Sequence, residues 1–427
     1  MVELFKHQSD VLNDTVNNNK VGYFLEMGLG KTFVASEKMK QLDTRINLVV
    51  CQKSKVDDWV EHFNRHYNYY VCDLTVKGGL EKFMHLCAYY NDMCFHDEIG
   101  VVGVINYDLI FRRKDLQQLT DYTLICDESG LLTNENAKRT KSIMNLNYKN
   151  LILLSGTICG GKYERLYAQL NMLGYKISKK AFYNMYVDYR YEDREGFPIM
   201  IIDGYKNVER LKNKLRQYGC VFMKSDEVFD LPQQTFIDLK VSTSKEYRTF
   251  RKDCICTVDG VELVGDTTLT KMLYERQLCG QYNVDKLNAF RDLLESTNDR
   301  LIVFYNFNDE LARLKTIAWE YTQNISEVNG TFKDLTAYEM FDDSITFIQY
   351  QSGAMGLNLQ KANKIVYYSP PLSSELYEQS KKRTHRIGQD KPCFYYRLIC
   401  KNSIEEKIYK TLEMRRDYTD KLFERGD

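Results

Sequence analysis

The chain has 427 residues, which at roughly 150 residues per domain suggests two or three domains. Hydrophobic residues make up 44% of the sequence and charged residues 28%, so the composition is that of a globular protein and excludes wholesale disorder. The 59 Lys and Arg residues balance the 59 Asp and Glu residues, which excludes a polycation that binds nucleic acid by net charge but not a local basic groove.

The sequence also predicts a cytoplasmic protein with no membrane partner. Its longest apolar stretches, such as residues 301–305, are far shorter than the roughly 20 residues that a membrane span requires. Residues 1–8 lack the basic and apolar regions of a secretory signal. The 12 cysteines are scattered singly, which indicates reduced thiols rather than a disulfide framework.

In the first half of the chain, short β-branched or apolar runs alternate with longer stretches of helical spacing. The expected strands are residues 22–25, 47–51, 100–105, 124–126 and 151–154. Such alternation is typical of an α/β domain with a parallel sheet. Between about 162 and 225 the pattern changes to helical stretches around a Tyr-rich segment, so we expect a small helical protrusion on this domain.

A second α/β alternation follows Leu231-Pro232, where proline disfavours helix at the residue before it. The expected strands are residues 301–305, 344–349, 364–368 and 393–399, and a charged amphipathic helix should run from 403 to about 424. The sequence therefore predicts an α/β protein of two lobes, residues 1–231 and residues 232–427.

A glycine-rich turn lies between the expected strand 22–25 and an expected helix 33–41. Its glycines let successive backbone N–H groups converge on one anion, and the N-terminus of the helix favours negative charge. A lysine in this place reaches the outer phosphates, and a threonine hydroxyl ligates Mg²⁺. The alternative is a plain strand-to-helix turn, because the strict motif has glycine where Leu25 stands. The predicted phosphate-binding residues are Met27, Gly28, Leu29, Gly30, Lys31 and Thr32.

Two acidic residues, Asp127 and Glu128, end the apolar strand 124–126. Nucleotides bind outside the carboxyl ends of strands in open α/β sheets. Asp127 is therefore a candidate Mg²⁺ ligand, and Glu128 is a candidate group that orients or deprotonates the attacking water. The alternative is a pair of solvated acids at the start of a loop.

Motif-like segments follow one another along most of the chain. In the first half they are residues 5–8, 26–32, 49–54, 105–107, 127–128 and 155–157, and in the second half 302–307, 352–359 and 379–389. In this order the segments resemble the motifs of helicase superfamily two. The last segment ends in Arg386-Ile-Gly-Gln389 and resembles the SWI/SNF-type double-stranded-DNA translocases within that superfamily.

The resemblance implies two RecA-like lobes and an ATP hydrolase that uses ATP and Mg²⁺. It implies that Gln8 recognises adenine, that Gly356 and Gln379 contact the nucleotide, and that Arg383 and Arg386 are arginine fingers from the second lobe. The implied catalytic residues are Lys31, Glu128, Arg383 and Arg386. The implied nucleic-acid contacts are Lys53, Ser54, Tyr107, Asn306 and Ser352. The chain departs from the family pattern at Gln52, Ser129-Gly130, Ile158 and 369–371.

The predicted function is an ATP-driven motor, a DNA-stimulated ATPase that translocates along duplex DNA through sequence-independent backbone contacts. The alternatives are a strand-separating DNA or RNA helicase, a nucleic-acid-binding scaffold with a vestigial ATPase, and a motor subunit that serves a separate nuclease or modification enzyme. The compact length favours a bacterial cell or a phage-infected cell, replication or recombination proteins as partners, and a monomer.

One further cluster could suggest zinc. His85, Cys87, Cys94 and His96 offer four ligands in twelve residues, but their spacing matches no standard zinc finger or ribbon. A helix would separate residues two apart, so we expect this segment to be structural rather than metal-binding.

Overall fold

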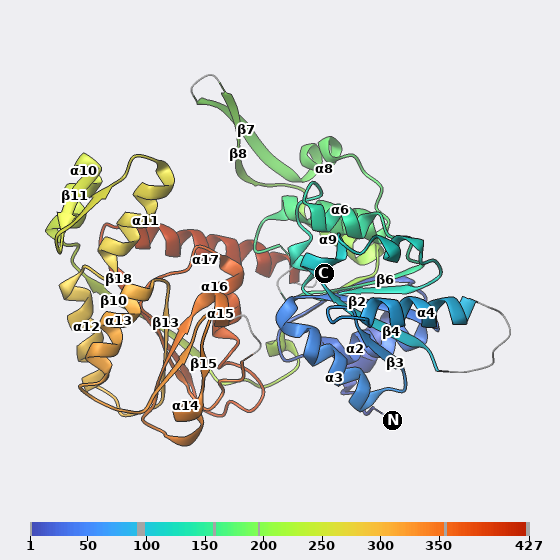
Figure 1. Cartoon of the computed structure of the whole chain (residues 1–427). Coiled ribbons are helices and arrows are strands. Elements are labelled where there is room, and N and C mark those ends of the chain that lie inside the picture. The colour runs from blue at the N-terminus through green and yellow to red at the C-terminus, as the bar shows by residue number, and fades with distance from the viewer. Residues whose placement is uncertain (1, 92–98, 157–158, 195–196, 354–356, 424–427) are drawn as a thin grey trace. The chain divides into compact units, whose positions relative to one another are not determined.

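The computed structural model describes residues 2–91, 99–156, 159–194, 197–353 and 357–423 (Figure 1). The chain divides into two compact units, residues 1–228 together with 417–427, and residues 229–416. The prediction had placed all of 232–427 in the second lobe. The residues from Asp417 onward group with the first unit because Tyr418 packs against Tyr163 and Tyr205, with ring centroids 6.0 and 4.9 Å away.

The first unit is built on a seven-stranded sheet, as far as the described residues show, in the order β3-β4-β2-β5-β6-β1-β9. All of its strand pairs are parallel. The strands are β1 (Lys20–Leu25), β2 (Ile46–Cys51), β3 (Tyr70–Asp73), β4 (Val101–Asn106), β5 (Thr123–Cys126), β6 (Asn150–Leu154) and β9 (Cys220–Met223). The five expected strands are confirmed, and the structure adds the two edge strands β3 and β9, which are less buried.

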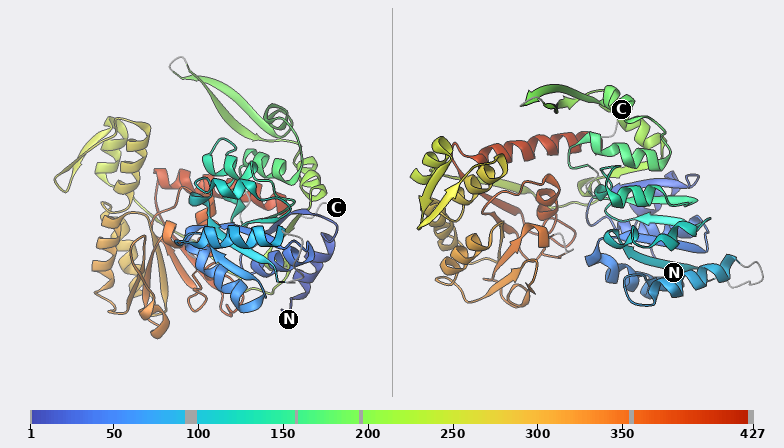
Figure 2. Two further views of the ribbon diagram at one scale, coloured as in Figure 1. Left: turned by 45° about the vertical axis from the view of Figure 1, so that its right-hand side comes forward. Right: turned by 45° about the horizontal axis from the view of Figure 1, so that its top comes forward.

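Helices lie on both faces of this sheet (Figure 2). On one face, Leu48, Val50 and Leu124 form a core with Phe83 of α4 (Gly79–Asn91) and Leu170 of α7 (Leu166–Leu173). The helices of this unit outside the protrusion are α1 (Lys6–Asp14), α2 (Lys31–Gln41), α3 (Val56–His66), α4 (Gly79–Asn91), α5 (Tyr107–Ile110) and α6 (Lys138–Met144). Short 3₁₀ turns occur at Lys53–Lys55, Lys114–Gln118, Ser129–Leu131, Tyr163–Arg165 and Ser225–Glu227.

The expectation of a helical protrusion over 162–225 is wrong for its Tyr-rich part. Helices α7 (Leu166–Leu173), α8 (Lys179–Tyr186) and α9 (Val208–Gln217) are present, but β7 (Val187–Arg194) and β8 (Phe197–Tyr205) form an antiparallel ribbon that extends from α8 (Figure 1). Tyr189 and Tyr191 face Ile202 and Met200 across the two strands. Aromatic and β-branched pairs of this kind favour strands over helices.

The second unit has its own seven-stranded sheet among the described residues, in the order β10-β18-β17-β13-β16-β14-β15. Its pairs are parallel except β14 with β15. The strands are β10 (Gln234–Val241), β13 (Leu301–Tyr305), β14 (Ile325–Val328), β15 (Lys333–Asp334), β16 (Ile345–Gln349), β17 (Lys364–Tyr367) and β18 (Cys393–Cys400). The predicted fold class, an α/β protein with two parallel-dominated sheets, is confirmed.

Each face of this second sheet has its own core. On one face α12 (Val284–Glu295) and α13 (Asn308–Ala318) bury Phe290 and Leu314 against the strands. On the other face pack α14 (Thr336–Met340), α15 (Tyr350–Gly353), α16 (Ser374–Lys381) and α17 (Ile404–Phe423). A smaller cluster combines α10 (Lys245–Asp253), β11 (Ile255–Val258), β12 (Val261–Val264) and α11 (Thr268–Cys279). Among the described helices, none has the length and hydropathy needed to cross a membrane.

Candidate nucleotide site

The candidate site follows from the parallel order of the first sheet. Strands β1, β5 and β6 all end at one edge, and the chain leaves this edge through the glycine-rich turn, the acidic pair and Ser155-Gly156 respectively. In open α/β sheets this carboxyl edge is where ligands bind. The fold therefore brings together residues that are about a hundred positions apart in the sequence.

The glycine-rich turn has the backbone that phosphate binding requires. Gly28 and Gly30 have φ angles of 91° and 72°, a left-handed conformation that favours glycine. A Cβ atom at Gly30 would also collide with Nε2 of Gln8. The turn is fixed from the neighbouring strand β9, because Ser225 follows that strand, and its N–H donates to Glu26 Oε2 at 2.9 Å and its hydroxyl to Met27 O at 3.1 Å.

The first turn of α2 fits an anion. Gly30 is its N-cap and supplies no capping side chain, and no acidic residue stands in the first turn. The positive end of the helix dipole therefore adds to the charge of Lys31. Lys31 Nζ donates to Leu25 O at 2.8 Å and to Glu26 O at 3.1 Å, and a Cβ at Gly156 would lie 3.4 Å from it. The lysine thus lies between the turn and the end of β6, and these residues fit a phosphate.

Gln8, predicted to recognise adenine, contacts the same turn. Its side-chain Nε2 donates to Leu29 O at 3.2 Å, and its Oε1 accepts from the Phe5 N–H at 3.0 Å. His7 Nε2 also lies 3.2 Å from Leu29 O. Gln8 is 4% exposed. The structure thus places Gln8 against the phosphate turn, while adenine recognition stays a prediction.

The acidic pair is held by three hydrogen bonds. Asp127 Oδ2 accepts from the indole N–H of Trp59 at 2.9 Å, and Oδ1 accepts from the Glu128 N–H at 3.0 Å. The Tyr107 hydroxyl donates to Asp127 O at 2.7 Å. Glu128 itself has a left-handed backbone with φ of 51°. Non-glycine residues with a left-handed backbone cluster at active sites.

Tyr107 and Trp59 are two of the residues that support Asp127. Tyr107, predicted to contact nucleic acid, is 2% exposed, and its hydroxyl supports the acidic pair, while its nucleic-acid contact stays a prediction. Burial raises its pKa well above the ordinary value, so the phenol stays a donor. Trp59 receives no role from the sequence alone, because its partner Asp127 is 68 positions away.

The basic motif of the second unit follows α16. Arg383 is 2% exposed, and Arg386 donates through Nη1 to Asn358 Oδ1. The turn is fixed by His385 Nε2, which lies 2.8 Å from Pro232 O, and by Gln389 Nε2, which donates to Ala362 O at 2.9 Å. Burial lowers the pKa of Arg386, but a guanidinium stays protonated in proteins.

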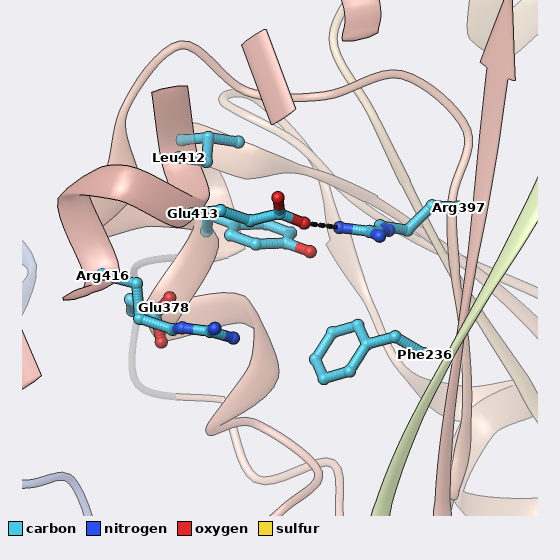
Figure 3. A pocket seen from close by; sticks show the side chains of 7 residues that line it. Phe236, Glu378, Arg397, Leu412, Glu413 and Arg416 are labelled. Carbon is cyan, nitrogen blue, oxygen red and sulfur yellow. Dashed lines mark hydrogen bonds and ion pairs between the residues drawn. The ribbon is translucent and has the colours of Figure 1, made fainter. Parts of the chain in front are cut away.

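A pocket of about 130 Å³ in the second unit is lined in part by α16 (Figure 3). Its lining residues are Phe236, Tyr377, Glu378, Arg397, Leu412, Glu413 and Arg416. The Arg397 guanidinium donates to Asp238 at 2.6 Å and to Glu413 at 2.8 Å, and lies over the Tyr409 ring. Glu378 accepts from the buried ammonium of Lys381 at 2.6 Å. The Arg397 pairs thus join β18 to β10 and to α17, and the Glu378–Lys381 pair lies within α16, the helix that carries Gln379 and leads into Arg383.

The remaining predicted residues are only partly placed. Lys53 and Ser54 are exposed, so their nucleic-acid contacts stay predictions. Asn306 Nδ2 donates to Ser369 Oγ at 2.8 Å and to Pro370 O at 3.1 Å. Gly356 and the side chain of Ser352 lie outside the described residues. So do Cys94 and His96 of the zinc hypothesis, while His85 and the buried Cys87 lie on α4.

The first unit has a glycine-rich turn that fits a phosphate and an acidic pair at one edge of its sheet. The second parallel α/β unit carries an arginine-rich motif. Together these features are typical of two-lobed nucleotide-dependent enzymes. Two protein-family models match this chain. Residues 10–284 match the SNF2-related domain, and residues 285–388 match the helicase conserved C-terminal domain. The chain belongs to the SNF2-related family. The class predicted from the motifs, an SWI/SNF-type enzyme of helicase superfamily two, is thereby confirmed.

Curated relatives align along most of this chain. The chain is 23% identical to the ISWI chromatin-remodeling complex ATPase ISW1 of Saccharomyces cerevisiae over 92% of its length and 38% of the relative's. It is 24% identical to the DNA repair and recombination protein RAD54-like of Drosophila yakuba over 90% of its length and 57% of the relative's. The chain thus spans about two fifths to three fifths of these relatives. The Sulfolobus solfataricus SWI2/SNF2 ATPase core in complex with dsDNA is 17% identical, with a TM-score of 0.44 and coverage of 98% of this chain and 92% of that one.

Proposed function

We propose that this protein is an ATP-driven motor on DNA, a DNA-stimulated ATPase that translocates along the duplex. The observation that carries the proposal is the convergence of the Lys31 turn and the Asp127-Glu128 pair at the carboxyl edge of one parallel sheet. Membership of the SNF2-related family supports it, and so does the similarity to a chromatin-remodeling complex ATPase and to a DNA repair and recombination protein.

In the first unit, each residue has a proposed part in ATP hydrolysis. Lys31 and the N-terminus of α2 bind the phosphates, and Gln8 recognises adenine. Thr32 and Asp127 hold Mg²⁺, which when bound supplies positive charge that stabilises the transferring phosphoryl group. Glu128, which follows Asp127 at the end of β5, orients and deprotonates the attacking water.

The second unit completes the proposed site. Arg383 and Arg386 stabilise the charge that develops on the transferring phosphate, and Gly356 and Gln379 contact the nucleotide. Guanidinium groups suit this part because they are permanently charged and donate in a planar fork. Each nucleotide state would favour a different arrangement of the two units, and alternation between arrangements would move the protein along DNA.

The proposed DNA contact is electrostatic. Lys53 and Ser54 are exposed after the carboxyl end of β2 and are available to phosphates, so binding should weaken as salt rises. A cytoplasmic location, a monomeric state and partners among bacterial or phage replication and recombination proteins belong to the same proposal.

The decisive experiment is ATP hydrolysis measured in parallel with no nucleic acid, duplex DNA, single-stranded DNA and RNA. Duplex DNA should stimulate turnover most, and the protein should displace a triplex-forming strand from a duplex. Glu128→Gln should abolish hydrolysis while ATP still binds, and Glu81→Gln, an exposed acid on α4, is the matched control. Undiminished turnover in Glu128→Gln would contradict the part given to Glu128. Nucleotide binding without turnover on any nucleic acid would favour the scaffold alternative.

One observation favours a second candidate, the strand-separating helicase. The β7–β8 ribbon exposes two aromatic side chains, Tyr191 at 65% and Phe197 at 74%. Exposed aromatic rings stack on unpaired bases, and apolar wedges can unstack a duplex. The test is a strand-displacement assay beside the triplex-displacement assay. Wild-type protein that unwinds strands but does not displace a triplex-forming strand would favour this candidate over duplex translocation. The unwinding should then be lost in Tyr191→Ala or Phe197→Ala.

A further inference from the structure

We infer that Trp59 is a positioning residue for magnesium, because its indole N–H orients the Asp127 carboxylate that would ligate the ion. The inference rests on the proposed ATP site and concerns how that site holds its metal. Its basis is the 2.9 Å hydrogen bond between Trp59 Nε1 and Asp127 Oδ2, made between two residues of the first unit. The sequence analysis assigned no role to Trp59.

The indole ring is itself held in one orientation. Trp59 lies on α3, which follows the carboxyl end of β2, and is 2% exposed. Its ring stacks on Phe63, with centroids 5.7 Å apart and an interplanar angle of 27°, and meets the edge of His62 at 5.8 Å. A buried donor in a packed ring has little freedom to follow the carboxylate. The carboxylate is therefore the group that is oriented.

The carboxylate has a donor on each oxygen. Oδ2 accepts from Trp59, Oδ1 accepts from the Glu128 N–H at 3.0 Å, and the backbone N–H of Asp127 donates to Val50 O at 2.8 Å. Together these bonds fix both the plane of the carboxylate and the strand end that carries it. The lone pairs that remain on the two oxygens can accept a cation, because each carboxylate oxygen has more than one acceptor direction.

The chemistry of the donor suits a metal site. Indole N–H donates only, carries no charge and does not titrate, so it orients the carboxylate without neutralising it. A lysine or arginine in its place would compete with the metal for the same negative charge. Carboxylates that ligate metals are usually hydrogen-bonded in this way, and loss of the outer partner costs roughly 10–100-fold in metal affinity or activity.

The competing explanation is that Trp59 only fills the core under α3. The two roles separate if the N–H is removed while the ring is kept. Trp59→Phe keeps an aromatic ring beside Phe63, and benzothienylalanine at position 59 keeps the whole bicyclic shape but has sulfur in place of the N–H. The matched control is Trp319→Phe, because Trp319 is the other of the two tryptophans in the chain and lies in the second unit, 50% exposed.

The first measurement is ADP affinity by calorimetry, with EDTA and with Mg²⁺, on the full chain. Wild type and Trp319→Phe should bind ADP more tightly with Mg²⁺. In Trp59→Phe and in the benzothienylalanine protein, this Mg²⁺-dependent gain should fall about tenfold or more, while affinity in EDTA stays within about twofold of wild type. A purely structural role would change both affinities together.

The second measurement is spectroscopic and needs no turnover. Trp319→Phe leaves Trp59 as the single tryptophan, so its emission should change when Mg²⁺ is added to the ADP complex and should not change on addition of Mg²⁺ to an Asp127→Asn version of the same protein. If the emission of Trp59 does not change on addition of Mg²⁺ to the protein that retains Asp127, the inference is contradicted.

The outcomes separate this inference from the proposed function. A full Mg²⁺-dependent gain in both Trp59 variants would overturn the inference and leave the ATP site intact. Equal losses with and without Mg²⁺ would also overturn it, in favour of packing. Absence of any Mg²⁺-dependent nucleotide binding in wild type would instead refute the proposed function. Should Trp59→Phe fail to fold, the benzothienylalanine protein decides.

Discussion

At the scale of single residues, the candidate site depends on close packing as much as on charge. Gly30 is left-handed and lies against Gln8, and the Gln8 amide in turn bonds to Leu29 O. The residue predicted to recognise adenine is therefore also a support of the phosphate turn. A side chain added at position 30 should therefore disturb both the phosphate turn and the predicted adenine contact of Gln8.

Gly30→Ala tests this packing. Alanine at a left-handed position costs roughly 1 kcal/mol or more, and at position 30 its Cβ would also collide with Gln8 Nε2. We expect ATP affinity, measured with a fluorescent ATP analogue, to fall about tenfold or more while circular dichroism stays native. Gly78→Ala is the matched control, because Gly78 has φ of 79° and open space around it. Equal loss of affinity in both variants would show that strain alone, and not Gln8, is responsible.

His62 gives a prediction about pH. Burial and the neighbouring His66 lower the pKa of His62 from 6.5 to about 4. Its Nε2 lies 3.0 Å from the Ser36 hydroxyl. Because the unfolded chain binds a proton at this histidine between pH 6.5 and 4 and the folded chain does not, stability should be full above pH 6.5 and should fall as the pH drops towards 4.

The measurement is urea unfolding of wild type and His62→Gln across this pH range. The difference between the two curves should amount to about 1 kcal/mol, since partial exposure of the ring weakens the effect of the pKa shift. Glutamine can still bond to Ser36 but does not titrate. Parallel curves for the two proteins would mean that His62 titrates normally in the folded state.

At the scale of elements, the sequence predicted strands best where burial leaves a continuous apolar run. The expected strand 301–305 coincides with β13, and 344–349 contains β16. Strands with alternating exposure were missed, among them β10, in which exposed and half-buried residues alternate along its length. The β7–β8 ribbon differs from the expected helical protrusion because Tyr189 and Tyr191 pair with Ile202 and Met200 of the other strand, and such pairing is not visible in local spacing.

A buried ion pair connects two elements of the second unit and makes a stability prediction. Lys286 of α12 donates to Glu405 of α17 at 2.6 Å, and their side chains are 0% and 1% exposed. Burial opposes the charge on Lys286, but the attraction of Glu405 is stronger, and the pKa of Lys286 is therefore raised. Glu405 also accepts from the Cys400 N–H at 2.9 Å.

Glu405→Gln should destabilise the protein by about 3–5 kcal/mol, because it leaves a buried ammonium without its counter-charge. Lys286→Met with Glu405→Leu should recover part of this loss, since no buried charge remains. Urea unfolding measures both. The control is Glu339→Gln, which breaks an ion pair with Lys361 whose side chains are both 51% exposed and should cost less than about 1 kcal/mol. A cost for Glu405→Gln as small as that of the control would contradict the prediction.

At the scale of the whole molecule, motif order identifies candidate site residues but not how they are held. The order of Lys31, Asp127 and Arg386 along the chain is visible in the sequence, and so is the resemblance that relates them. The bonds from Trp59 to Asp127 and from Ser225 to Glu26 are not, because they join positions 68 and 199 apart. Such contacts depend on sheet order and on which face a helix presents, and both are settled only by the folded chain.

ATP hydrolysis is expected to need residues of both units. If Arg386 acts on the phosphate bound by the first unit, Arg386→Ala should lower turnover about 10³-fold or more, while ATP affinity changes only a few-fold. Stopped hydrolysis with retained binding is expected because the finger stabilises charge that develops only in the transition state. Arg386→Lys should restore little, since the ammonium lacks the planar fork. Arg313→Ala, which removes an exposed arginine of the same unit paired with Asp259, is the control and should turn over normally. If Arg386→Ala hydrolyses ATP at the wild-type rate while Glu128→Gln does not, the first unit performs the chemistry alone, and hydrolysis could not drive a motor through the arginine fingers.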